Sequence, residues 1–182
     1  GSYIEQKRNY ITFLSVIICG LAKGLVRHEI FNSYRDGNKI HIYDDVNVGV
    51  VIALEKNISV AIIKEADKLN PAKVTKELLR IRKELLGKKS NPDDFSGGTM
   101  TVSAMDHTEI TSFVPIVHPD QAAVLAIPKI QSKIVLDKNN LVCKEQFINL
   151  GLSFDHSYLD ANQANTFLTS LVEEIDLVIE NL

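Results

Sequence analysis

The side chains best suited to proton transfer lie in the segment from Ser153 to Asp160, which reads S-F-D-H-S-Y-L-D. This segment joins a hydrophobic stretch, typical of a strand, to the start of the last predicted helix. A histidine there has a rigid support and a ring that is free to face a cleft. The ordinary pKa of histidine, about 6.5, suits proton exchange near neutral pH, so His156 is a candidate general base. Without further signals, a histidine in such a place is more often a structural or surface residue.

Three helices are predicted from apolar residues that recur at steps of three and four. They cover residues 12–27, 71–86 and 161–182. Asn70 has the residue type of an N-cap for the second helix, and Asp160 can cap the third in a capping box with Gln163. Gly20 and Gly24 are neighbours on the first helix, where they would let another backbone approach closely.

Strands are predicted from short apolar or alternating runs bounded by turn signals. They cover residues 39–43, 46–54, 58–63, 99–103, 113–117, 122–127, 132–136 and 147–154. The dipeptide Asp36-Gly37 indicates a hairpin. The run 46–54 has few polar residues, which favours a central strand buried on both faces. Strands first alternate with helices and then follow one another, so the expected fold is α/β or α+β, a two-layer domain with a mixed sheet.

The composition excludes several classes of protein. The chain has 182 residues and a formal net charge of −3, without the clustered basic residues of a nucleic-acid binder. The apolar run 11–22 is too short to span a bilayer, and we expect a cytoplasmic protein. Residues 1–2 are predicted to be the remnant of an expression tag. A single domain then covers residues 3–182.

No metal site is expected, because the cysteines and histidines lack the spacing of ligand sets. Cys19 lies in an apolar helical run and Cys143 at a predicted strand end, and both are expected to be core or near-core thiols. The remaining histidines are interpreted as structural or solvated. They are His28, His41, His107 and His118.

The segment around His156 resembles a family motif. Residues 155–161 read D-H-S-Y-L-D-A, which is similar to the D-H-R-x-x-D-G motif of the catalytic domain of dihydrolipoamide acyltransferases from 2-oxoacid dehydrogenase complexes. Further blocks resemble that family in the same order. They are V-N-V-G-V at 46–50, I-I-K-E-A-D-K at 62–68, G-G-T-M-T-V-S at 97–103, S-F-V-P-I-V at 112–117 and Q-A-A-V-L at 121–125.

The resemblance implies a chloramphenicol acetyltransferase-like fold, a mixed sheet with helices on one face, in trimers whose active sites lie between subunits. It also implies that His156 takes the proton from the thiol of dihydrolipoamide or coenzyme A, and that the thiolate attacks a thioester. Ser103 corresponds to the family's serine whose hydroxyl donates a hydrogen bond to the oxyanion. The alternative interpretation of Ser103 is a strand-end serine bonded to local backbone. Asp160 corresponds to an ion-paired aspartate that supports the site, a role compatible with capping a helix.

The implied substrate is coenzyme A or acyl-CoA, with a lipoyl group supplied by another domain or protein and no metal. The implied partners are two further copies of the chain in a homotrimer, a larger assembly of such trimers, and a lipoyl-carrying protein. Leu177 lies off the apolar stripe of the last helix, and this excess of apolar surface favours a partner.

The chain also departs from the family pattern. Ser157 stands in place of the arginine and Ala161 in place of the glycine, and the loop 104–111 does not match. We expect the family's opening segment, its lipoyl domain and its subunit-binding domain to be missing. The lost opening segment is then the expected place of the usual arginine partner of Asp160.

Two alternatives remain at this point. One is a non-catalytic trimeric core that assembles a multienzyme complex, although a scaffold needs neither His156 nor Ser103. The other is an acetyltransferase that acts on a small acceptor other than a thiol.

Overall fold

The computed structural model describes residues 11–53 and 58–182, and the three expected helices are present. They are α1 (Phe13–Arg27), α2 (Pro71–Leu86) and α3 (Ala161–Glu180). The predicted caps are confirmed: the Asn70 side chain accepts from the backbone N–H of Lys73, and Asp160 forms a reciprocal capping box with Gln163. The predicted tag remnant at residues 1–2 lies outside the described residues.

The central sheet is mixed and has the order β4-β3-β5-β6-β9. Its strands are β3 (Val48–Ala53), β4 (Ile58–Ile63), β5 (Met100–Ala104), β6 (Ala123–Ile127) and β9 (Gly151–Phe154). Strands β3, β5 and β6 run parallel, whereas β4 and β9 run antiparallel at the two edges. β3 has two strand neighbours, as predicted, but the strand buried along its whole length is β6. The predicted end of β3, at residue 54, lies outside the described residues.

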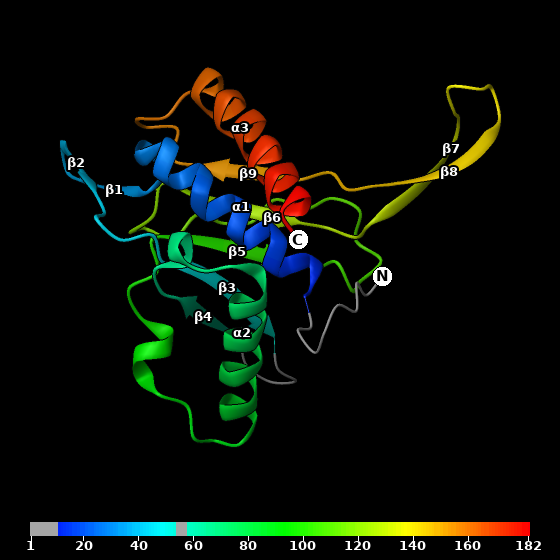
Figure 1. Cartoon of the computed structure of the whole chain (residues 1–182). Helices are drawn as coiled ribbons and strands as arrows, with labels where there is room; N and C mark the ends of the chain where they lie inside the picture. The colour runs from blue at the N-terminus through cyan, green and yellow to red at the C-terminus, as the bar shows by residue number, and fades with distance from the viewer. Residues whose placement is uncertain (1–10, 54–57) are drawn as a thin grey trace.

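Two hairpins accompany the sheet. The first pairs β1 (Ser33–Asp36) with β2 (Lys39–Ile42) across the expected Asp36-Gly37 turn, where Gly37 has a φ of 57°. The second pairs β7 (Gln131–Leu136) with β8 (Val142–Phe147) and projects away from the rest of the molecule (Figure 1).

Two predicted strands are wrong. Residues 113–117 form no strand in the described part of the chain: they are paired in no ladder there, and Pro115 has no N–H to donate to one. The strand predicted over 147–154 begins too early: residues 151–154 form β9, whereas Phe147 is the last residue of another strand, β8, and residues 148–150 are in neither. β8 pairs with β7 in the hairpin and β9 pairs with β6 in the sheet, and apolar alternation does not show where a chain changes its partner.

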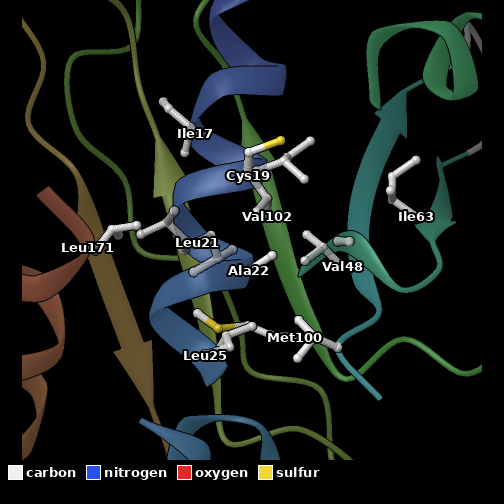
Figure 2. Close-up of a cluster of buried hydrophobic side chains, with 14 of the residues drawn as sticks. Ile17, Cys19, Leu21, Ala22, Leu25, Val48, Ile63, Met100, Val102 and Leu171 are labelled. Atoms are coloured by element: carbon white, nitrogen blue, oxygen red, sulfur yellow. The ribbon is translucent and has the colours of Figure 1, made fainter. Parts of the chain in front are cut away.

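All three helices cover one face of the sheet, with α1 between α2 and α3 (Figure 1). Figure 2 shows α1 in front of β5, with Leu21, Ala22 and Leu25 of the helix near Met100 and Val102 of the strand. These side chains belong to one buried apolar cluster. The centre of the domain is therefore the contact of α1 with the central strands.

The two cysteines differ in environment. Cys19 is buried in the core as expected, and burial raises the pKa of its thiol to about 11. Cys143 is exposed on β8, so its assignment as a core or near-core thiol is wrong. The reason is that β8 belongs to the projecting hairpin rather than to the sheet.

Gly20 lets another backbone approach closely, as the sequence indicates, because α3 crosses α1 at this point. A Cβ atom on Gly20 would lie 2.6 Å from Ile175 Cγ1 and 3.0 Å from the Ile175 backbone nitrogen. At Gly24 the nearest such atom is Phe167 Cε2 at 3.6 Å, an ordinary contact. Only Gly20 therefore needs to lack a side chain for the helices to pack.

We expect Gly20→Ala to lower the free energy of unfolding by about 1–3 kcal/mol, since α3 must move to make room. Gly24→Ala is the matched control, and we expect it to be neutral or stabilising by up to about 1 kcal/mol, because alanine favours helix. Urea unfolding of both variants measures the difference. Equal stability of the two would contradict the close crossing.

No helix within residues 11–53 and 58–182 is long and apolar enough to cross a bilayer. Within the same residues, no three side chains of His, Cys, Asp and Glu gather as metal ligands would.

Candidate functional site

His156 lies in a tight turn between β9 and α3. The backbone N–H of Asp155 donates to the carbonyl of Ala122 at 2.8 Å, which fastens the start of the turn to the residue before β6. The Asp155 carboxylate accepts from the backbone N–H of Ser157 at 2.9 Å, and the Leu159 N–H donates back to the Asp155 carbonyl at 3.1 Å. Leu159 is buried and the capped end of α3 follows, so both ends of the turn are held.

The side chain of His156 is exposed, and its one ring neighbour among the described residues is Phe154, with 5.3 Å between ring centroids. The pKa of the neighbouring Asp155 carboxyl is lowered, first by the hydrogen bonds from Ser157 and also by the positive charge of Arg35. The turn therefore carries a fixed negative charge beside a histidine that is open to a ligand or a partner surface.

The hairpin β1–β2 supplies neighbours that the sequence did not point to. The Ser33 hydroxyl lies 3.1 Å from the Tyr158 hydroxyl, and Arg35 acts electrostatically on Asp155. These residues are more than 110 positions away from the turn in the sequence, and no spacing pattern could have linked them to it.

Ser103 lies near the end of β5, on the sheet face opposite the helices. Side chains alternate along a strand, and Met100 and Val102 point into the helical layer (Figure 2). Ser103 is half-buried, and no hydrogen bond of its hydroxyl is found within the described part of the chain. The alternative in which Ser103 bonds local backbone therefore has no support in the structure.

One copy of the chain does not bring Ser103 and His156 together. The strand registers place Ser103 level with Ala126 and Gly151, whereas Phe154 is level with Ala123 at the other end of the sheet. The separation is two strand spacings across and three residues along, on the order of 10 Å in each direction. His156 lies further still, beyond the end of β9. A site that uses both side chains needs a second copy.

Asp160 is exposed and serves as the N-cap of α3, where its carboxylate accepts from the Gln163 N–H at 2.8 Å. No ion pair of Asp160 is found among residues 11–53 and 58–182. The structure thus shows the capping role of Asp160, and Asp160 directly follows the turn that carries His156.

Large apolar side chains are exposed on two segments outside the central sheet. On the β7–β8 hairpin, Ile134 and Val142 are 77% and 72% exposed. On the segment 113–117, Val114 and Ile116 are 86% and 94% exposed. Exposed apolar side chains that cluster in this way mark interaction surfaces. Leu177 of α3, predicted from the sequence to face a partner, is less exposed than either pair.

The fold belongs to the chloramphenicol acetyltransferase-like class. A solved chloramphenicol acetyltransferase superposes with a TM-score of 0.56 over 90% of this chain and 78% of that chain, at 13% identity, which shows the fold alone. A probable dihydrolipoamide acetyltransferase from Listeria monocytogenes superposes with a TM-score of 0.85 at 25% identity, over 93% of this chain and 72% of that one.

The family model for the catalytic domain of 2-oxoacid dehydrogenase acyltransferases matches residues 2–181, and the chain belongs to this family. The lipoamide acyltransferase component of the branched-chain alpha-keto acid dehydrogenase complex of Bacillus subtilis is 29% identical over 91% of this chain. The dihydrolipoyllysine-residue acetyltransferase component of the pyruvate dehydrogenase complex of Buchnera aphidicola subsp. Schizaphis graminum is 31% identical over 91% of this chain. The chain spans 40% and 42% of those two proteins.

Proposed function

We propose that this chain transfers an acyl group between coenzyme A and a thiol such as dihydrolipoamide. One observation carries the proposal: in a chain of the acyltransferase family, an exposed histidine in a held turn and a serine hydroxyl with no hydrogen-bond partner among the described residues occupy the matching motifs. The same two residue types are named, together with an asparagine, in work on the catalytic mechanism of the dihydrolipoamide acetyltransferase of Azotobacter vinelandii.

In the proposed reaction His156 accepts the proton of the attacking thiol, and the sulfur keeps the electron pair. The thiolate forms a bond to the carbonyl carbon of the thioester, and the carbonyl oxygen takes up the negative charge. The Ser103 hydroxyl donates a hydrogen bond to that oxygen. When the tetrahedral intermediate collapses, the other carbon–sulfur bond breaks, and the leaving thiolate takes the proton back from the imidazolium.

We further propose that the working unit is a homotrimer in which His156 of one copy faces Ser103 of the next. Support comes from the strand registers, which separate the two side chains within a copy. It also comes from the exposed apolar side chains of the β7–β8 hairpin and of residues 113–117. Closed rings are the ordinary result of such heterologous contacts.

Complementation tests the shared site. His156→Ala and Ser103→Ala proteins are dissociated, mixed in equal amounts and reassembled. Random reassembly makes three quarters of the trimers mixed, each with one intact site out of three, so activity should return to about a quarter of the wild-type value.

Each variant reassembled with itself is the control and should stay inactive. Fluorescence transfer between differently labelled subunits establishes that exchange has occurred. No recovery after proven exchange would show that the two side chains do not form a site between copies, and so would a monomer in light scattering.

A second candidate function is a non-catalytic assembly core, which the exposed apolar hairpin favours. A solved relative, at 23% identity and a TM-score of 0.83 over 94% of this chain and 70% of that one, is the cubic core of a pyruvate dehydrogenase multienzyme complex. For this chain a larger assembly and a lipoyl-carrying partner are part of the proposal.

Acyl-transfer assays separate the candidate functions. An assembled wild type that transfers no acyl group from acetyl-CoA to dihydrolipoamide would favour the scaffold. Transfer to small alcohols but not to thiols would favour a non-thiol acceptor. The cytoplasmic location stays a prediction.

A further inference from the structure

Tyr158 links the His156 turn to a distant part of the fold. Its ring packs against the buried cluster, and its hydroxyl lies 3.1 Å from the Ser33 hydroxyl at the start of β1. Ser33 has no exposed surface and is paired in the β1–β2 ladder opposite Ile42. The contact therefore joins a loop residue to a side chain that cannot move independently of the core.

The direction of this hydrogen bond follows from the proton count. A serine hydroxyl has one proton, and the Ser33 hydroxyl donates it to the carbonyl of Ile30 at 2.7 Å. The phenol of Tyr158 must then donate to the Ser33 oxygen. Burial raises the pKa of the Tyr158 phenol above its ordinary value, and the Asp155 carboxylate acts in the same direction. The phenol therefore keeps its proton near neutral pH.

Among the described residues, the Tyr158–Ser33 contact is the one side-chain hydrogen bond that ties the turn to a residue outside its own segment. The bonds of Asp155 to Ser157 and Leu159 are local and can move with the turn as one unit. Ser157 replaces the arginine of the family motif, and the side chain of Ser157 is exposed. A turn that carries a base needs support from the surrounding fold, because an error of about 1 Å in its position can cost about 100-fold in rate.

We propose that Tyr158 is a positioning residue for His156, and that its hydrogen bond to Ser33 holds the turn in the orientation that proton transfer requires. The inference rests on the proposed acyl transfer. Tyr158 itself touches neither the thiol nor the thioester in this account.

The test is Tyr158→Phe, which keeps the ring and removes the donor. In the trimeric protein we expect kcat for transfer from acetyl-CoA to dihydrolipoamide to fall about ten-fold, with KM for acetyl-CoA within about two-fold of wild type. The matched control is Tyr34→Phe, one residue along β1, because the Tyr34 hydroxyl makes no hydrogen bond within the described residues. Its kcat should be that of wild type.

A double-mutant cycle with Ser33→Ala sharpens the result. Both changes remove the same hydrogen bond, so the double variant should be no slower than the slower single variant. The inference would be overturned if the loss of kcat in the double variant were the product of the two single losses, or if kcat were unchanged in Tyr158→Phe.

A second readout separates this inference from the proposed function. The ring signals of His156 in the NMR spectrum, assigned by their absence from His156→Ala, should shift or broaden in Tyr158→Phe and not in Tyr34→Phe. Unchanged His156 signals would overturn the positioning role, even if the variant is less stable or slower. A wild type without activity would refute the proposed function, and the NMR comparison would still decide the positioning.

Discussion

His156→Ala is expected to lower acyl transfer about 100- to 10,000-fold while the oligomer stays intact. The physical reason is that a thiol attacks poorly until it has lost its proton, and a positioned general base typically contributes a factor of this size. Alanine removes the imidazole from an exposed position, so no core contact is lost. The measurement is transfer from acetyl-CoA to dihydrolipoamide, with the oligomeric state followed by light scattering.

The pH dependence offers an independent check of this role. A thiol has an ordinary pKa of about 8.5, so raising the pH supplies thiolate without a base and should restore part of the rate of His156→Ala. His28→Gln serves as the control histidine substitution, because the His28 ring belongs to the helical layer and not to the His156 turn: it packs edge-on against Phe167. Wild-type rates in His156→Ala at neutral pH would exclude His156 as the base.

Ser103→Ala is expected to lower kcat on the order of 100-fold and to leave coenzyme A binding nearly unchanged. The hydroxyl has no ground-state partner among the described residues, so its removal strands no buried group. Its proposed hydrogen bond strengthens with the charge that develops on the carbonyl oxygen. An interaction of this kind stabilises the transition state more than the bound substrate, and it therefore appears in kcat rather than in KM.

Ser59→Ala is the control for the Ser103 substitution, since Ser59 is a half-buried strand serine on β4, outside the proposed site. Its kcat and KM should both match wild type. A Ser103→Ala protein with a raised KM and an unchanged kcat would assign the hydroxyl to substrate binding instead. Comparable losses in both serine variants would point to a general effect on the sheet.

Several local features of this fold could be predicted from the sequence because short-range physics determines them. Asn70 and Asp160 have side chains that satisfy the free N–H groups of a helix start, and both cap helices as expected. The hairpin at Gly37 follows from the tolerance of glycine for a positive φ. The candidate base could be located because a histidine between a strand and a capped helix matches an ordered family motif.

Only the tertiary structure decided how distant segments meet. Residues 113–117 and 147–154 have strand composition, but pairing depends on which neighbour is present, and neither stretch forms a single strand. The exposure of Cys143 has the same origin. The contact of Tyr158 with Ser33 spans 125 positions and depends on where β1 packs.

The separation of Ser103 from His156 also depends on pairing. Each side chain is evident in the sequence, but the register of β5, β6 and β9 places them at opposite ends of the sheet. Strand register is set by side-chain packing over the whole sheet rather than by any local segment. The sequence by itself therefore points to the two groups proposed for the chemistry, whereas the folded chain shows that one copy holds them apart, which is the reason for proposing that a second copy completes the site.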